Sequence, residues 1–457
     1  MIKDNASFRD PSGFVFSQEG KIYRWVSPTY MPQYQHLMNS GLYRALVDKR
    51  LLVAHKEVSL DGFRSGEGIV IQPKRIPFIS YPYEWCFDQY RDAALATMDI
   101  QNLALEYGMV LKDASAYNIQ FLTGYAVLID TLSFDFYQEG SPWGAYGQYC
   151  RHFLAPMMLM AHIDQRLSKL MQSFIDGIPL DLASSLLKGH GGRIAAQMHI
   201  HSHAKSITKH NDDGKKGKVI QYDMKKSTLI AFCNSLRKDT AKLWAKQGTT
   251  EWGDYYSNTN YDNAAAECKA DVIRAMLSTI QPLKHVWDLG ANDGRYSRIA
   301  EMLGAHVVAF DIDSNAVSHN WETVKDSHEK LLPLILDLSA PSPAIGFGNE
   351  ERKTIDQRQR PDCIMILAVI HHMAISNNLP FDRIAHWTAG LSDNLIIEFV
   401  PKNDSQVQVL LATREDIFID YDETHFEAAF SQYYEMVQKK TIAGTKRILY
   451  IWKLKNQ

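Results

Sequence analysis

Short, nearly continuous runs of hydrophobic residues recur through the second half of the chain and alternate with segments of helical spacing, such as 295–303. Runs of this kind are typical of strands that are buried on both faces of a parallel sheet. Their alternation with helices predicts an α/β domain with a Rossmann-like sheet. The expected parallel strands are 285–288, 307–311, 331–337, 362–368 and 395–400.

The last two hydrophobic runs, 434–440 and 447–453, are separated only by a short segment that contains Gly444. Two strands that are joined by a short glycine-containing loop form an antiparallel hairpin. We therefore expect a sheet of seven strands that ends in an antiparallel hairpin. The ordinary dinucleotide-binding fold lacks such a hairpin.

The first half has a different pattern, in which short hydrophobic runs and longer helical segments are mixed. It predicts a hairpin over 13–24, a strand at 69–72, a helix over 87–107 and a strand at 125–130. A run rich in methionine and aromatic residues, 153–160, has helical spacing and is expected to lie in the core. This half is predicted to be an α+β domain.

The two halves are separated by a polar, charged and glycine-containing stretch, 205–218, which is typical of a linker or exposed loop. Helical spacing resumes around 227–237. We therefore divide the chain into an N-terminal domain at 1–200, a linker and connecting helix at 201–244, and a C-terminal domain at 245–457.

The amino-acid composition argues against several classes of function. Hydrophobic residues make up 46% and charged residues 22% of the 457 residues, and the formal net charge is −3, so no excess of positive charge favours nucleic-acid binding. The five cysteines are scattered and form no CxxC pair, which favours reduced thiols. No hydrophobic run is long enough to cross a bilayer, and the N-terminus lacks the hydrophobic core of a signal peptide. These features predict a cytoplasmic protein that binds neither nucleic acid nor membrane.

A nucleoside-binding pattern lies at the first strand of the C-terminal domain. The strand leads into a turn with two glycines, and the next strand ends in an acid about twenty residues later, the distance expected across a βαβ unit. Glycines let the backbone approach a nucleoside closely, and the acid accepts the ribose hydroxyls. Asparagine at the middle position tolerates a left-handed turn. These residues are Asp288, Gly290, Asn292, Gly294 and Asp311.

The pattern lacks the third glycine that serves a pyrophosphate, and from about Trp252 onward the chain resembles the class I S-adenosylmethionine (SAM)-dependent methyltransferases. The resemblance implies SAM as cofactor, with Asp288 either structural or in contact with its methionine amino group. It places Asp337 at the adenine and makes Ala368, at the end of the fourth strand, a further cofactor contact. The aromatic residues at 252–256 and Tyr261 either cover the SAM pocket or pack on the core.

Candidate catalytic residues follow the fourth and fifth strands. His371 and His372 lie where methyltransferases place groups that face the substrate, and a histidine is the natural base near neutral pH. Alternatively, one ring packs under the sheet and the other caps a turn. Glu398 is the third candidate, and its alternative role is an ion pair with Lys402 or Arg447. No metal is expected in this domain.

In the N-terminal domain, Asp113 and Asn118 are five residues apart and Asp130 ends a short strand twelve residues later. This spacing resembles the catalytic loop and metal-binding site of protein kinases, which implies Mg-ATP as a further ligand. However, the domain lacks a glycine-rich phosphate loop, and Thr131 and Leu132 follow the second acid. The alternative is a degenerate kinase-like domain in which these polar side chains tie loops together.

The whole chain is similar to bacterial methyltransferases related to rhizobial host-specificity nodulation proteins, on the stretches Glu84-Trp85, 111–114 and 371–376. The similarity implies a SAM-dependent methyltransferase for a small-molecule or glycoconjugate acceptor, whose N-terminal domain assists substrate recognition. Two alternatives remain. One is a bifunctional kinase-like phosphotransferase and methyltransferase, and the other is a non-catalytic SAM-binding scaffold. The partner proteins are not indicated.

Overall fold

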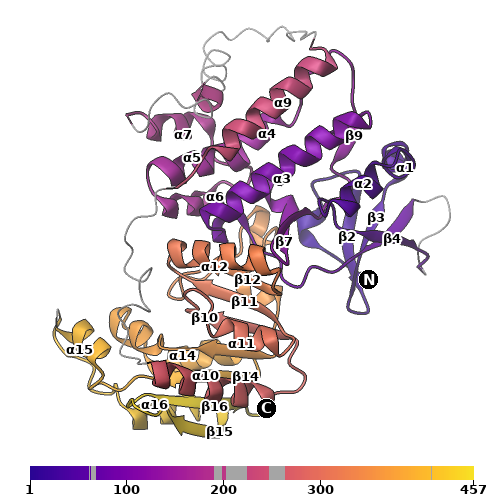
Figure 1. The fold of residues 1–457 in the computed structure, drawn as a ribbon. Coiled ribbons are helices and arrows are strands. Elements are labelled where there is room, and N and C mark those ends of the chain that lie inside the picture. The colour runs from indigo at the N-terminus through magenta and orange to yellow at the C-terminus, as the bar shows by residue number, and fades with distance from the viewer. Residues whose placement is uncertain are drawn as a thin grey trace. The chain divides into compact units, whose positions relative to one another are not determined.

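The computed structural model describes residues 1–60, 62, 68–189, 198–201, 224–245, 263–412 and 414–456. The chain forms two compact units (Figure 1). The N-terminal unit comprises Met1–Lys246 and Ala344–Arg352, and the C-terminal unit comprises Gln247–Pro343 and Lys353–Gln457. The segment Ala344–Arg352 therefore packs with the N-terminal unit although it follows the third strand of the C-terminal unit. The hydrophobic pattern gave no indication of this.

The C-terminal unit is built on a seven-stranded sheet in the order β12-β11-β10-β13-β14-β16-β15 (Figure 1). The strands are β10 (His285–Leu289), β11 (His306–Asp311), β12 (Leu331–Ile335), β13 (Cys363–Ile366), β14 (Asn394–Phe399), β15 (Tyr434–Thr441) and β16 (Ile448–Leu454). The first five are parallel, whereas β16 is antiparallel to both β14 and β15. The prediction of a seven-stranded sheet with a terminal antiparallel hairpin is confirmed.

The strand order reverses at β10, because β11 lies on one side of it and β13 on the other. Such a reversal leaves a crevice at the carboxyl ends of parallel strands, where ligands bind in open α/β sheets. In the connections, α10 packs with α11 and α14 packs with α16. The helices are α10 (Asn263–Ser278), α11 (Ser297–Met302), α12 (Ser314–Ser327), α13 (Ile355–Arg358), the π-helix η9 (His372–Ser376), α14 (Phe381–Leu391), α15 (Ser405–Leu411) and α16 (Glu423–Phe430).

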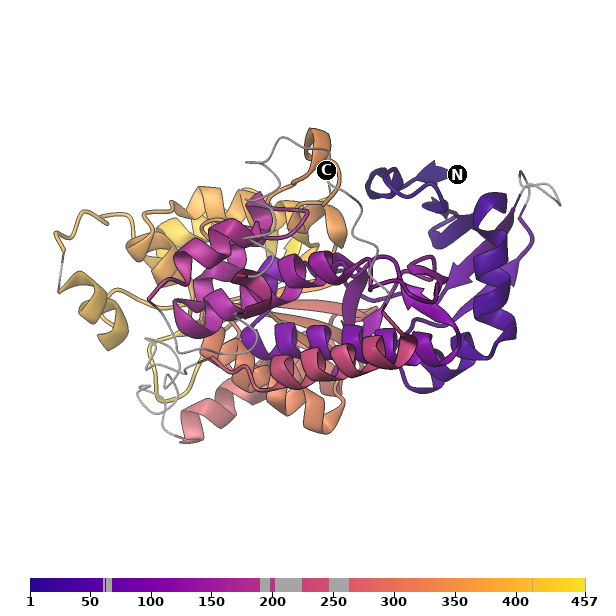
Figure 2. The same ribbon diagram turned by 90° about the horizontal axis from the view of Figure 1, so that it is seen from above.

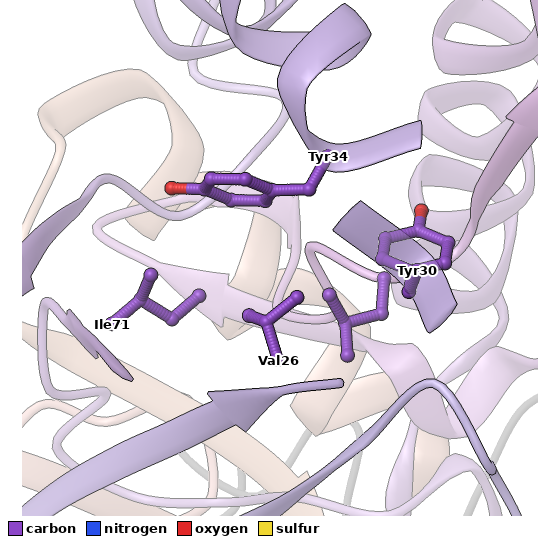
Figure 3. Packing of buried hydrophobic residues seen from close by; sticks show 5 residues of the cluster. Val26, Tyr30, Tyr34 and Ile71 are labelled. Carbon is purple, nitrogen blue, oxygen red and sulfur yellow. The ribbon is translucent and has the colours of Figure 1, made fainter. Parts of the chain in front are cut away.

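The N-terminal unit begins with an antiparallel five-stranded sheet in the order β1-β2-β3-β5-β4. Its strands are β1 (Ile2–Lys3), β2 (Gly13–Gln18), β3 (Lys21–Val26), β4 (His55–Val58) and β5 (Ile69–Pro73). The helices α1 (Met31–Asn39) and α2 (Leu42–Asp48) follow β3. Figure 3 shows the core between this sheet and α1, formed by Val26, Tyr30, Tyr34, Ile71 and Leu132.

Two short ribbons follow the sheet. β6 (Met109–Leu111) pairs with β9 (Phe134–Phe136), and β7 (Ile119–Leu122) pairs with β8 (Tyr125–Leu128). The polar loop after β6 is thereby brought to the turn that follows β8, because the backbone N–H of Ile129 donates to the carbonyl of Asn118.

The remaining helices of the N-terminal unit surround the long α3 (Phe87–Glu106). Figures 1 and 2 show α9 (Lys226–Ala241) lying along α3, where Arg237 donates to both carboxylate oxygens of Asp99. The methionine-rich run forms α5 (Ala155–His162), which is buried from Ala155 to Met160 as expected for a core helix. The other short helices are η1 (Asn5–Ser7), η2 (Pro28–Tyr30), η3 (Pro82–Glu84), η4 (Ala116–Asn118), α4 (Tyr146–Tyr149), η5 (Cys150–Leu154), η6 (Gln165–Lys169), α6 (Leu170–Ser173), α7 (Leu180–Leu186) and η8 (Phe347–Asn349).

Two sequence-based expectations concern residues outside the described ranges. The linker at 205–218 and the aromatic residues at 252–256 and Tyr261 all fall there. Among the helices that the structure describes, none combines the length and hydrophobicity needed to cross a lipid bilayer.

Candidate functional site

A cavity of about 590 Å³ opens at the carboxyl ends of the parallel strands of the C-terminal unit. Its walls include the residues that directly follow β10, β11, β12 and β13, together with parts of α10, η9 and α15. Six of the seven expected cofactor-binding residues line it. These are Asp288, Gly290, Asn292, Asp311, Asp337 and Ala368.

The loop after β10 lies close to the residues that follow the neighbouring strand β13. Gly290 has a φ of +86°, and a Cβ atom at this position would lie 2.2 Å from Cγ2 of Val369. Asn292 also adopts a left-handed conformation, with a φ of 51°. The expected seventh residue, Gly294, does not line the cavity and instead faces α12. A Cβ atom there would meet the side chain of Asn320 at 2.6 Å.

Asp311 closes the same loop from the end of β11. Its carboxylate accepts hydrogen bonds from the backbone N–H groups of Asn292, at 2.8 Å, and Asp313, at 2.9 Å. The side chain is buried, and this burial raises the pKa of Asp311 to about 6. Asp313 is the N-cap of α12, where it accepts from Asn315 and Ala316.

Asp288 is buried at the end of β10. Ser297 Oγ donates to its Oδ2 at 2.6 Å, whereas Oδ1 has no hydrogen-bond partner among the described residues. Burial raises the pKa of Asp288 to about 7. A buried acceptor left open at a cavity wall is ready for a donor from a ligand, since an unmade buried hydrogen bond is costly.

Lys269, on α10, is a cavity residue that the sequence did not indicate. Its side chain is 2% exposed, and Nζ lies 2.6 Å from Oε2 of Glu398. The ammonium also lies 4.4 Å from the ring centroid of Tyr296, a second lining residue that the sequence did not indicate. Burial lowers the pKa of Lys269, and the carboxylate of Glu398 opposes this shift.

Glu398 does not line the cavity. Besides Lys269, its carboxylate faces Arg447, with Oε1 at 3.6 Å from Nη1. Arg447 in turn donates from Nε to Asp404 at 2.8 Å. Of the two ion pairs considered for Glu398, the one with Arg447 forms, whereas Lys402 pairs with Asp416. Lys269, Glu398, Arg447 and Asp404 therefore form a continuous series of charged side chains from the cavity wall to the N-terminus of α15.

The two candidate histidines differ in their access to the cavity. His372 lines it, whereas His371 is 1% exposed and its Nδ1 has no hydrogen-bond partner among the described residues. Their ring centroids are 4.1 Å apart. Burial, and then the positive charge of Arg447, lower the pKa of His372 to about 4. Burial also places the pKa of His371 well below its usual value. Both rings are therefore neutral at pH 7.

The walls after β12 and β13 complete the cavity. Asp337 accepts hydrogen bonds from the N–H and hydroxyl of Ser339, which fix the turn after β12. Ala368 has a φ of +55°, a conformation that is strained for alanine. Such strain persists where the surroundings enforce it, often at functional sites.

The three candidate kinase-like residues lie in the N-terminal unit. The carboxylate of Asp113 accepts from Asn118 at 3.0 Å and from Gln148 at 2.7 Å. Asp130 is paired with Arg24 of β3. All three side chains are thus engaged within the protein. No group of three or more His, Cys, Asp or Glu side chains able to hold a metal ion occurs within the described ranges.

The chain is similar to solved methyltransferase structures over less than half of its length and to a nodulation protein over nearly all of it. No family model matches it. It is similar to the N-methyltransferase NodS from Bradyrhizobium japonicum WM9, at 12% identity and a TM-score of 0.32, over 43% of this chain and 99% of that chain. It is similar to the magnesium protoporphyrin IX methyltransferase ChlM from Synechocystis PCC 6803, at 15% identity and a TM-score of 0.32, over 45% and 93%.

A relative that spans both units decides the family. The chain is 32% identical over 458 residues to the nodulation protein NoeA of Rhizobium meliloti (strain 1021). The match covers 97% of this chain and 94% of that protein. The similarity to rhizobial nodulation proteins is therefore confirmed over both units. The chain belongs to the family of the nodulation protein NoeA.

Proposed function

We propose that the protein is a SAM-dependent methyltransferase whose cofactor binds in the cavity of the C-terminal unit. The observation that carries this proposal is that Gly290, Asp311 and Asp337 line one cavity from three successive strands. These residues are separated in the sequence. Gly290 is expected to bring the loop backbone close to the cofactor, Asp311 to bind its ribose and Asp337 to contact its adenine. The cavity's volume of about 590 Å³ lies within the usual range of small-molecule sites.

The residues present fit SAM. The open Oδ1 of Asp288 suits a donor such as the methionine ammonium, and the carboxylate of Asp311 suits the ribose hydroxyls. Because Gly290 has no side chain, the loop after β10 can approach Val369, which lines the same cavity. When bound, SAM supplies an electrophilic methyl group that is transferred by in-line displacement. The protein therefore has to orient the acceptor and, where needed, remove its proton.

We propose His372 as the group that takes a proton from the acceptor, because it lines the cavity and is neutral at pH 7. His371 packs behind it and holds the ring in place. Glu398 acts through Lys269 and is a positioning residue. The acceptor is a small molecule or a glycoconjugate, and the formal charge of −3 speaks against a nucleic acid. The protein would act in the cytoplasm, where its five free cysteines remain reduced.

We further propose that the N-terminal unit has a degenerate kinase-like fold and assists substrate recognition. The pairing of β6 with β9 and of β7 with β8 supports this proposal, because it sets Asp113, Asn118 and Asp130 around one turn. The Arg24 guanidinium occupies the carboxylate of Asp130 that a magnesium ion would need. Magnesium-dependent ATP binding that is lost in Asp130→Asn would favour the bifunctional alternative.

Replacing Asp311 by alanine is expected to weaken binding of S-adenosylhomocysteine by about 1–3 kcal/mol, the scale of a buried charged hydrogen bond left unmade. The variant also loses the bond that holds the N–H of Asn292. Calorimetric titration of the full chain measures the effect. Asp326→Ala, at an exposed position on α12, is the matched control and should bind like the unmodified protein. Equal affinity of a folded Asp311→Ala variant would overturn the ribose assignment.

Cofactor affinity is expected to fall as the pH is lowered from 8 to 5. The two raised pKa values, about 7 for Asp288 and about 6 for Asp311, mean that both carboxyls take up protons within this range in the empty protein. A ligand that binds the ionised carboxylates must displace these protons, so its affinity declines below each pKa by up to about tenfold per pH unit and proton. Titration of S-adenosylhomocysteine at a series of pH values measures this decline. In Asp311→Asn the step near pH 6 should disappear, and a flat profile in the unmodified protein would contradict the expectation.

A further inference from the structure

The two cations that line the cavity are in different electrostatic situations. Lys269 is buried against the carboxylate of Glu398, so its charge is compensated within the protein. Arg414 is exposed and forms no ion pair with any carboxylate in the described part of the chain. Its charge therefore remains available to a ligand.

The position of Arg414 is fixed by the π-helix that carries the candidate base. Its Nη1 donates to the carbonyl of Ile375 at 2.5 Å, in the last turn of η9. One role of this bond is to satisfy a carbonyl at the helix end. It engages one of the five N–H donors of the guanidinium, which leaves the planar fork able to bind an oxyanion.

Two further donors line the same wall. The hydroxyl of Ser376 and the side-chain amide of Asn377 follow Ile375 directly, and both residues line the cavity with Arg414. This wall also contains His372, whereas the three carboxylates of the cavity lie at the carboxyl ends of other strands, Asp288 and Asp311 within β10 and β11 and Asp337 just after β12. The cavity thus has acidic walls at the strand ends and a cationic, donor-rich wall at η9.

We propose that Arg414, Ser376 and Asn377 form a binding site for an anionic group of the methyl acceptor, a carboxylate or a phosphate. This inference rests on the proposed function, because it takes the cavity to be the methyl-transfer site. A planar guanidinium binds both groups in a bidentate manner. The site would hold the acceptor by its charged group while the atom to be methylated lies beside His372. Arg414 is thereby a specificity residue, and acceptors that carry an oxyanion are the preferred class.

The test uses benzoate, phenyl phosphate and the neutral analogue benzamide, titrated calorimetrically into the full chain with and without saturating S-adenosylhomocysteine. We expect the anions to bind at least about tenfold more tightly than benzamide, the scale of one charge-assisted hydrogen bond. Arg414→Gln should remove this preference, and Arg414→Lys should keep part of it because the charge remains without the fork. The tighter of the two anions identifies the group as carboxylate or phosphate.

Arg383→Gln is the matched control, since Arg383 is an exposed arginine of α14 that does not line the cavity. It should bind the anions like the unmodified protein, and Arg414→Gln should still bind S-adenosylhomocysteine. Benzamide binding as tightly as benzoate, or anion binding that survives Arg414→Gln, would overturn the inference. Failure of S-adenosylhomocysteine to bind counts against the proposed function instead, because the titrations without it measure the anion site independently.

Discussion

Replacing Gly290 by alanine is expected to destabilise the C-terminal unit and to remove most of its affinity for S-adenosylhomocysteine. A side chain at φ +86° is strained by about 1–2 kcal/mol. The new Cβ would also lie 2.2 Å from Val369, and relieving such overpacking typically costs about 1–3 kcal/mol. Because Val369 lines the cavity, its displacement changes the cofactor site itself, and we expect affinity to fall by about tenfold or more. Thermal unfolding and calorimetric titration measure the two effects.

Gly304→Ala separates the overlap from the backbone strain. Gly304 has a φ of +96°, so alanine is strained there in the same way, but a Cβ atom at this position would meet nothing within 4 Å. It follows α11 and does not line the cavity. This control should lose some stability and keep its affinity. If both variants lost affinity equally, the close approach of Gly290 to Val369 would be irrelevant to cofactor binding.

The part of the cavity formed at the ends of β10 and β11 was predictable because its determinants are local. Gly290 and Asp311 are separated by one βαβ unit, and the strands around them are hydrophobic runs whose ends are visible in the sequence. Asn292 adopts the left-handed conformation that its residue type permits. The exception is Gly294, which lies in the same motif but contacts Asn320 of α12. The motif's spacing does not distinguish a glycine needed for the ligand from one needed for helix packing.

The sequence indicated the pair of Glu398 with Arg447 as one alternative, but it did not indicate Lys269, because the partner of this lysine is distant in sequence. Lys269 reaches Glu398 across 129 positions, and neither residue stands in a recognisable motif. A lysine on an amphipathic helix is ordinarily exposed. Its burial follows from the position of α10 beside the sheet, which the hydrophobic pattern does not specify. Arg414, in the loop after α15, was not predictable for the same reason.

In the N-terminal unit, Asp113, Asn118 and Asp130 lie around one turn, and the kinase-like role inferred from their spacing stays a prediction. The bonds from Asn118 and Gln148 to Asp113 correspond to the expectation that polar side chains tie the loops together. The partner of Asp130 is Arg24, 106 positions earlier on β3. Only the packing of the five-stranded sheet brings this guanidinium to the loop, so the sequence alone left the magnesium hypothesis standing.

Replacing Lys269 by methionine is expected to destabilise the C-terminal unit by about 3–5 kcal/mol, because it leaves a buried carboxylate without its nearest counter-charge. Glu398 is fully buried, and after the substitution its remaining counter-charge is Arg447 at 3.6 Å, which is shared with Asp404. Methionine preserves most of the hydrophobic contact that the lysine stem makes, so the lost charge dominates. Urea unfolding that is monitored by hydrogen exchange of the backbone amides of β14 measures the stability of this unit separately from that of the N-terminal unit.

Three further variants, namely Lys402→Met, Glu398→Gln and the double variant of Lys269→Met with Glu398→Gln, show whether the unpaired charge is the cause. Lys402→Met breaks the solvent-exposed pair with Asp416 and should destabilise the unit far less than Lys269→Met, because water screens exposed charges. The double variant Lys269→Met with Glu398→Gln removes both buried charges and should be less destabilised than Lys269→Met alone, since Arg447 keeps Asp404. A double variant that is as unstable as the sum of the two single variants would mean that Lys269 and Glu398 do not interact energetically. Lys269 would then contribute through its packing against Tyr296, and the proposed role of Glu398 in positioning Lys269 would be wrong.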